Sequence, residues 1–237
     1  MTFTMPPGDT TPVEPANPNG NQAGQPVTPP APPAPIDYFG RIVGWANDRN
    51  LVAGSDSKSQ YLKLVSEFGE YLAATIARRV PGTDPFAANA AIADGIGDVA
   101  VVLTIIAAQN SVTFTNADIA APAYFGGLVE RWDQYFDMAF GLAASIGDLG
   151  DAIAKSQPVE PILRKAMLQL QYCAQMGWPL YASTGNDTSP FTNCLTNAWS
   201  DIKDRQGVMY NGVFVKSTDP NYAAALAALQ ASQTQAS

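Results

Sequence analysis

The sequence contains no histidine and only two cysteines among its 237 residues. Without histidine, the chain cannot use imidazole as a general acid–base group, as the partner of a serine or cysteine nucleophile, or as a zinc ligand. Cys173 and Cys194 do not form a C-x-x-C motif, so we expect reduced thiols, with a single disulfide as the alternative. A functional site in this chain must therefore be built from carboxylates, amides, hydroxyls and cations.

Long apolar runs and an excess of positive charge are also missing. The longest apolar run lies near Val99–Ala108, which is shorter than the about 20 residues that cross a bilayer, and no basic-then-apolar signal opens the chain. Acidic residues outnumber basic ones by 21 to 13, which gives a formal net charge of −8. Such a balance disfavours binding to nucleic acid or to anionic membranes. We therefore expect a soluble, cytoplasmic protein that binds neither.

Eleven of the 19 prolines lie in residues 1–35, where apolar residues are too few to offset the entropy of ordering. We expect a disordered proline-rich tail there. From residue 36 onwards helical spacing dominates, which predicts an all-α protein: an antiparallel helical bundle over 36–216, followed by a C-terminal helix and tail at 217–237. The expected helices cover about residues 36–51, 58–79, 85–109, 124–155 (with or without a break near Gly141 or Gly147–Gly150), 160–177, 192–205 and 222–231, with a loop at 179–190 and a short hairpin or extended segment at 208–216.

Residues 58–109 carry two pairs of acids at helical spacing. Glu67 and Glu70 are three residues apart, and Asp94 and Asp98 are four apart, so each pair lies on one face of its helix. The simpler interpretation of such a pair is a solvated helix face. The alternative is that the two helices pack side by side and that the four carboxylates converge on a divalent cation.

Asp98 favours the second interpretation. Between Ile96 and Ala108 the polar residues are Asp98 and Thr104 alone, so this helix must be largely buried. An unpaired buried carboxylate either costs several kcal/mol or becomes protonated, and a bound cation would remove that cost. Oxygen ligands without histidine favour Mg²⁺, or Mn²⁺, over zinc.

Part of this pattern recurs further along the chain. Residues 142–155 are similar to residues 64–78, with Gly147-Asp148 in the place of Gly69-Glu70 and Ser145 in the place of Glu67. Either residues 124–207 contain a degenerate second repeat that has lost its ligands, or helices rich in small residues simply look alike.

Four motifs occur in a fixed order, and together they resemble the MazG-like all-α nucleoside triphosphate pyrophosphohydrolases, especially those of bacteriophage type. The first resembles W-x-x-D-R-x-L, the second Q-x-x-K-L-x-E-E-x-G-E, the third D-x-I-G-D-x-x-V-V-L, and the fourth C-L-x-x-A-W-N-E-I-K-D-R-K-G followed by N-G-V-F-V-K. In this sequence they cover Trp45–Leu51, Gln60–Glu70, Asp94–Leu103 and Cys194–Lys216.

The resemblance implies a Mg²⁺-dependent enzyme that hydrolyses a (deoxy)nucleoside triphosphate to the monophosphate and pyrophosphate, for nucleotide-pool control in the cytoplasm of the host if a phage encodes it. It implies Glu67 as the group that orients or deprotonates the attacking water, and a homodimer or tetramer is expected. Lys63 either helps to bind the substrate or only pairs with Glu67, and Trp45 either stacks on the base or belongs to the core. The implied metal ligands are Glu67, Glu70, Asp94 and Asp98, and the implied substrate-binding residues are Lys63, Trp45, Lys203 and Arg205.

Three positions depart from the family pattern. Ser66 stands in place of an adjacent glutamate, Gly95 in place of the glutamate of E-x-x-D, and Ser200 in place of an asparagine. These departures favour an alternative function, that of a catalytically inactive helical interaction or assembly protein that keeps the fold.

Overall fold

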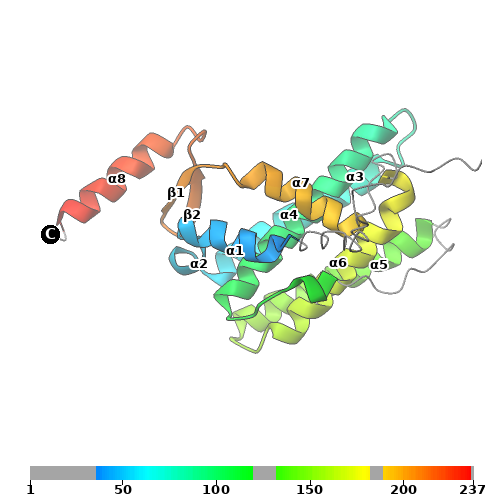
Figure 1. Ribbon diagram of the computed structural model, residues 1–237, viewed down its shortest axis with the longest axis horizontal. Coiled ribbons are helices and arrows are strands. Elements are labelled where there is room, and N and C mark those ends of the chain that lie inside the picture. Colours follow the sequence, from blue (N-terminus) through cyan, green and yellow to red (C-terminus); the bar gives the residue numbers. More distant parts are fainter. Residues whose placement is uncertain (1–35, 120–131, 182–188, 236–237) are drawn as a thin grey trace, which may run out of the picture. The chain divides into compact units, whose positions relative to one another are not determined.

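The computed structural model describes residues 36–119, 132–181 and 189–235. The tail predicted for residues 1–35 lies outside the described residues, as do residues 182–188 of the predicted loop. Residues 1–34 and 35–237 form separate units, and only the second is considered below. Within its described residues the chain is all-α, as predicted, with eight α-helices and one two-stranded hairpin (Figure 1). The elements are α1 (Tyr38–Asp48), α2 (Leu51–Gly54), α3 (Ser57–Ala77), α4 (Pro85–Gln109), the 3₁₀-helix η1 (Asn116–Ile119), α5 (Trp132–Ala154), α6 (Glu160–Tyr181), α7 (Pro190–Ile202), β1 (Gly207–Tyr210), β2 (Val213–Lys216) and α8 (Tyr222–Gln235).

Local side-chain chemistry sets most of these boundaries. The Asp56 carboxylate accepts a hydrogen bond from the Ser59 backbone N–H at 2.7 Å and so caps the first turn of α3. Asp84 caps α4 in the same way, and Pro85 occupies the first turn, where a missing N–H costs nothing. Asn211 and Gly212 both have positive φ, 50° and 77°, as the tight turn between β1 and β2 requires.

Two predicted boundaries differ from the structure. α5 is continuous through Gly141, Gly147 and Gly150, so the break considered there is absent. A glycine inside a helix costs about 1 kcal/mol, but packing offsets this cost because Gly150 lies against the Tyr61 side chain of α3. α6 continues to Tyr181, which takes the first residues of the predicted loop into the helix.

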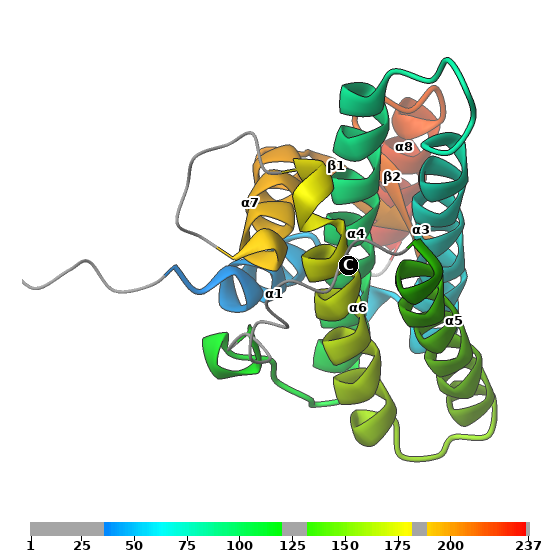
Figure 2. The same cartoon turned by 90° about the vertical axis from the view of Figure 1, so that its right-hand side faces the viewer.

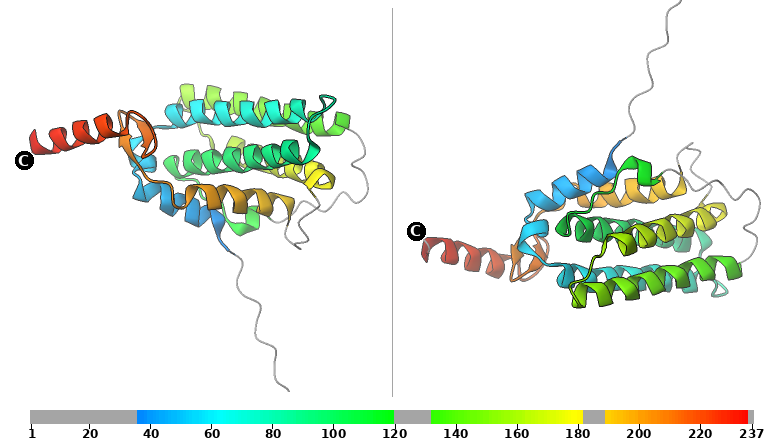
Figure 3. Two further views of the ribbon diagram at one scale, coloured as in Figure 1. Left: turned by 90° about the horizontal axis from the view of Figure 1, so that it is seen from above. Right: turned by 90° about the horizontal axis from the view of Figure 1, so that it is seen from below.

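Four helices form the bundle that carries the site. Figure 2 shows α3, α4, α5 and α6 running side by side, and contacts join α3 to α4, α4 to α6, α6 to α5 and α5 to α3. Figure 3 shows the same layers from two further sides, with the hairpin near one end of the helices. α3 and α4 come closest at Gly95, where an added side chain would collide with the backbone of Tyr71.

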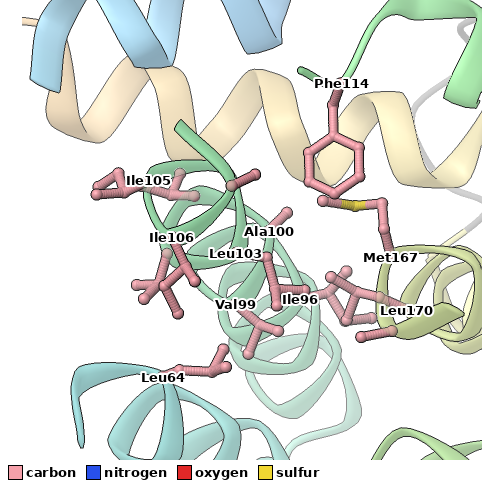
Figure 4. Close-up of a cluster of buried hydrophobic side chains, with 14 of the residues drawn as sticks. Leu64, Ile96, Val99, Ala100, Leu103, Ile105, Ile106, Phe114, Met167 and Leu170 are labelled. Carbon is pink, nitrogen blue, oxygen red and sulfur yellow. The ribbon is translucent and has the colours of Figure 1, made fainter. Parts of the chain in front are cut away.

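α4 is the central helix of the core. Leu64 of α3 lies on one side of it, and Met167 and Leu170 of α6 lie on another, where the Phe114 ring is next to Met167 (Figure 4). This 25-residue helix is longer than the apolar run near Val99–Ala108, and by length and composition it could cross a membrane. However, 72% of its apolar stretch is buried inside the fold. Its hydrophobicity is accounted for by the core, and the fold is compatible with a soluble protein.

Candidate functional site

A pocket with a volume of about 200 Å³ lies between α3, α4, the end of α7 and the hairpin. It brings together five of the eight site residues predicted from the sequence, which come from positions up to 160 residues apart: Trp45, Lys63, Glu67, Asp98 and Arg205. The other lining residues are Leu51, Ser59, Gln60, Val101, Val102, Ile105, Ile202, Gly212, Val213, Phe214 and Lys216.

The remaining three predicted residues lie outside this pocket. Glu70 and Asp94 are exposed and belong to the next turn of their helices, beyond Glu67 and Asp98. Lys203 is also exposed, with its ammonium 4.0 Å from the carboxylate of Asp204. Lys203 and Arg205 are both substrate-binding residues in the resemblance, and the structure brings Arg205 but not Lys203 to the pocket.

The pocket has two ends that differ in chemistry. Because α3 and α4 run antiparallel, residues earlier in α3 and residues later in α4 lie at the same end. Glu67 and Asp98 lie at one end. Gln60 lies seven residues before Glu67 in α3, and Ile105 lies seven residues after Asp98 in α4. At 1.5 Å per residue, these two residues place the second end about 10 Å from the first. The first end is therefore acidic, and the second is walled mainly by apolar side chains.

Asp98 is half-buried, and burial raises the pKa of its carboxyl from 3.8 to about 7, with further contributions from the nearby charges of Glu67 and Asp94. Asp94 is more exposed but also has a raised pKa, caused first by partial desolvation and then by the charges of Asp201, Glu67 and Glu70. Both shifts mean that negative charge at this end of the pocket is costly unless a positive group approaches.

Glu67 is buried, with 8% of its side chain exposed, and forms an ion pair with Lys63 one turn earlier in α3. Of the two roles considered for Lys63, the structure thus displays the pairing with Glu67, and it also places Lys63 in the pocket wall. Lys63, Arg205 and Lys216 are the cations among the lining residues. They outnumber the two lining carboxylates in a protein that is acidic as a whole.

The donor set fits a hard divalent cation in its chemistry, because the acids offer oxygen ligands only. Burial and the neighbouring carboxylates raise the pKa of Asp98 and Asp94, and a bound cation would offset that cost. The arrangement is open, however. Within the described ranges, no three acidic or thiol side chains lie close enough together to form a ready metal-binding group. Both cysteines are buried and free, and burial raises the pKa of each thiol to about 12, so neither offers a thiolate.

Part of the chain is similar to part of a phage protein. A protein of Haemophilus phage HP1, described as an uncharacterized 18.2 kDa protein in the rep-hol intergenic region, is 43% identical over 71 residues. The matched stretch is 30% of this chain and 38% of the phage protein. No family model matches the sequence, and no solved structure matches the chain.

Gly95 stands where the family pattern has a glutamate, and the packing of α3 against α4 explains this glycine. A side chain here would meet the Cα and backbone nitrogen of Tyr71, so a glutamate could not be accommodated while α3 and α4 stay this close. The close packing of α3 against α4 therefore explains why glycine, and not a further acid, occupies position 95.

The site includes polar groups that sequence reasoning missed. Gln60 is 8% exposed, and its amide nitrogen donates to the Ser55 hydroxyl at 3.1 Å, which leaves the carbonyl oxygen as an acceptor. The buried indole N–H of Trp45 has no hydrogen-bond partner among the described residues. Lys216 and Phe214 come from the hairpin, whose N-G-V-F-V-K sequence was the available signal.

The second helical hairpin, α5–α6, contains a neutral counterpart of the acids. Ser145, which matches Glu67 in the repeat considered above, is fully buried and its hydroxyl lies 2.6 Å from the side-chain oxygen of Gln169 in α6. Ser145 and Gln169 thus form a neutral pair between α5 and α6. Between α3 and α4, the corresponding space is faced by the carboxylates of Glu67 and Asp98. The duplication itself stays a prediction.

A larger cavity, of about 490 Å³, lies between α1, the end of α4 and residues 111–115. Among the described residues that line it, Asp37 is the one with a charge. Its chemistry does not suit an anionic ligand, in spite of its size.

Proposed function

We propose that this protein is a Mg²⁺-dependent pyrophosphohydrolase of bacteriophage type, which converts a (deoxy)nucleoside triphosphate to the monophosphate and pyrophosphate in the host cytoplasm. The observation that supports this most is the shared pocket of Lys63, Glu67, Asp98 and Arg205. These four residues come from three separate motifs of the resemblance, and they supply both the anionic and the cationic groups that the reaction needs.

The cations suit a polyphosphate. Three of the 13 basic residues line one pocket: Lys63, Arg205 and Lys216. Arginine can bind two phosphate oxygens at once, and lysine acts as a point charge. Lys63 is 54% exposed at its side chain and can turn from Glu67 towards the incoming phosphates. Binding of the triphosphate would thereby release Glu67 from its ion pair.

The second end of the pocket suits a nucleobase. Leu51, Ile105 and Phe214 provide apolar walls, and the Gln60 carbonyl offers an acceptor for a base N–H. One face of the Trp45 indole is covered by the Arg49 guanidinium, 4.8 Å from the ring centroid. We therefore assign Trp45 to the wall of the pocket and to the core. A cavity of about 200 Å³ is smaller than the roughly 300–1,000 Å³ of ligand pockets, so it encloses only part of the nucleotide. The base occupies the apolar end, and the phosphates lie against Lys63, Arg205 and Lys216.

In the proposed reaction, the Glu67 carboxylate accepts a proton from a water molecule whose oxygen forms a bond to the α-phosphorus. The bond between the α-phosphorus and the bridging oxygen breaks, and pyrophosphate leaves with the electron pair, neutralised by Arg205 and Lys216. A divalent cation held by Glu67 and Asp98, with Glu70 and Asp94 beside them, would supply Lewis acidity and a more acidic bound water. Burial raises the pKa of Asp98, so its carboxyl would lose its proton when the cation binds.

The test is a screen of the canonical nucleotides with Mg²⁺, in which pyrophosphate and orthophosphate are measured separately. We expect pyrophosphate and monophosphate in equal amounts from at least one deoxynucleotide. In water enriched in ¹⁸O, the label should enter the monophosphate. Label in the pyrophosphate, or release of orthophosphate alone, would exclude attack at the α-phosphorus.

A second candidate function is a catalytically inactive helical interaction protein. The open arrangement of the acids and the ion pair on Glu67 favour it. Thermal unfolding with Mg²⁺ and a non-hydrolysable nucleotide separates the two functions. At a ligand concentration 100-fold above Kd, a working site gains about 2.7 kcal/mol, or roughly 5–10 °C in Tm. An unchanged Tm with every canonical base would favour the interaction protein.

A further inference from the structure

Arg49 joins parts of the pocket that are 156 residues apart in the chain. Its Nε donates a hydrogen bond to the backbone carbonyl of Arg205 at 2.7 Å, and its Nη1 donates to the carbonyl of Trp45 at 3.2 Å. The same guanidinium lies over the Trp45 ring. Arg49 itself does not line the pocket, so its contacts act on residues that do.

These contacts continue into the hairpin and return to Arg205. The Trp45 ring meets the ring of Phe214 in an edge contact, with centroids 6.0 Å apart. The Phe214 ring in turn covers Gly207, where any side chain would collide with it and with the Val215 carbonyl. Gly207 follows Arg205 by two residues. Arg49, Trp45, Phe214, Gly207 and Arg205 therefore form a closed circuit of contacts, which we call the pocket ring.

The chemistry of the ring requires arginine at position 49. No ion pair joins Arg49 to a carboxylate within the part of the chain that the structure describes, so salt bridging does not account for its half-buried charge. Its planar guanidinium can lie flat on the indole and still donate from its edge to two carbonyls. A lysine ammonium keeps the charge but cannot do both.

We propose that Arg49 is a positioning residue, which holds the Arg205 backbone and the hairpin wall in place and so sets the affinity of the pocket for the nucleotide. This inference rests on the proposed function. It assigns a role to the arginine of the first motif and explains why that motif and the fourth are both needed for one site.

The first test is a double-mutant cycle between Arg49 and Arg205. Arg49→Ala is expected to lower kcat/KM about tenfold, mainly through KM, and Arg49→Lys should do nearly the same because geometry matters more than charge. In an Arg205→Ala background, Arg49→Ala should change kcat/KM less than twofold, because the side chain that the Arg49 contact positions is already absent. Arg41→Ala is the control: Arg41 is an exposed arginine of α1, the helix that ends directly before Arg49, and its substitution should leave kcat/KM within twofold of the wild type. A tenfold loss in both backgrounds would overturn the proposal.

The second test needs no turnover and so separates this proposal from the proposed function. The other three of the four tryptophans are replaced by phenylalanine, and acrylamide quenching of Trp45 fluorescence is measured. Removal of the guanidinium in Arg49→Ala should raise the quenching constant at least twofold, and Arg41→Ala should leave it unchanged. If no nucleotide is hydrolysed, the proposed function fails, and the quenching measurement still tests the role of Arg49. Equal quenching constants in the wild type and Arg49→Ala would overturn the role proposed for Arg49.

Discussion

Asp98→Asn should stabilise the protein in the absence of divalent metal, although it removes a functional group. The structure raises the pKa of Asp98 from 3.8 to about 7, first through burial and then through the charges of Glu67 and Asp94. At one pKa unit per about 1.36 kcal/mol, this difference sets a ceiling of about 4 kcal/mol. Because Asp98 is only half-buried and partly screened by solvent, we expect roughly half of that, about 2 kcal/mol.

The sign follows from proton binding in the two states. Between pH 4 and pH 7 the unfolded chain has lost the Asp98 proton and the folded protein still holds it, so rising pH removes stability over this range. Above pH 7 the full cost is present, and below pH 4 there is none. The asparagine variant should therefore gain about 4–8 °C in Tm at pH 8 in EDTA, and the gain should fade towards pH 4.

The assay is thermal unfolding followed by circular dichroism from pH 4 to pH 8. Asp148→Asn is the matched control, because Asp148 occupies the same Ile-Gly-Asp sequence on α5 but is exposed, and its Tm should not change with the substitution. Added Mg²⁺ should stabilise the wild type and not Asp98→Asn. A variant no more stable than the wild type at pH 8, or a gain that is the same at pH 4, would refute this reasoning.

Other substitutions test the packing of the site and the state of assembly. Phe214→Ala should raise KM about fivefold in the pyrophosphate assay with little change in kcat, because it opens the wall of the pocket. Gly95→Glu should lower the free energy of unfolding by roughly 3 kcal/mol in urea titrations, because its side chain meets the Tyr71 backbone. The homodimer or tetramer expected from the sequence stays a prediction, and the exposed apolar face of α3, which includes Leu62 and Val65, is the surface on which to test it. Val65→Lys should reduce the mass measured by sedimentation velocity, whereas an unchanged mass would exclude this face.

Local signals explain why the all-α class and most helix ends could be predicted. Asp56, Asp84 and the Asn211-Gly212 turn each determine a boundary through contacts within three residues, and such contacts are visible in a sequence. The continuity of α5 was not visible, because Gly150 is accommodated by Tyr61 from a different helix.

The candidate site was predictable in part for the same reason. Helical spacing placed Glu67 and Asp98 on inward faces, and the motifs added Lys63, Trp45 and Arg205, which the pocket brings together. Spacing could not decide how far the acids would converge, since three or four residues along a helix also means a full turn of displacement. Glu70 and Asp94 accordingly lie in the next turn, outside the pocket.

Contacts between segments that are distant in the chain could not be predicted from the sequence. Arg49 and Arg205 belong to two quoted motifs, but only the fold brings the side chain of one to the backbone of the other. Phe214 and Lys216 likewise gain their roles from the position of the hairpin against α1 and α3. Such residues become visible only when the motifs are placed in one structure.

The most direct test of the central claim is pyrophosphate release by the wild type and by Glu67→Gln, at matched helical content and with Mg²⁺. Glutamine keeps the size of the side chain but cannot accept the proton of the attacking water. We predict that the wild type releases pyrophosphate from a deoxynucleoside triphosphate and that the variant loses at least 100-fold in kcat, about 2.7 kcal/mol of transition-state stabilisation. Equal turnover by the two proteins would contradict a reaction centred on Glu67.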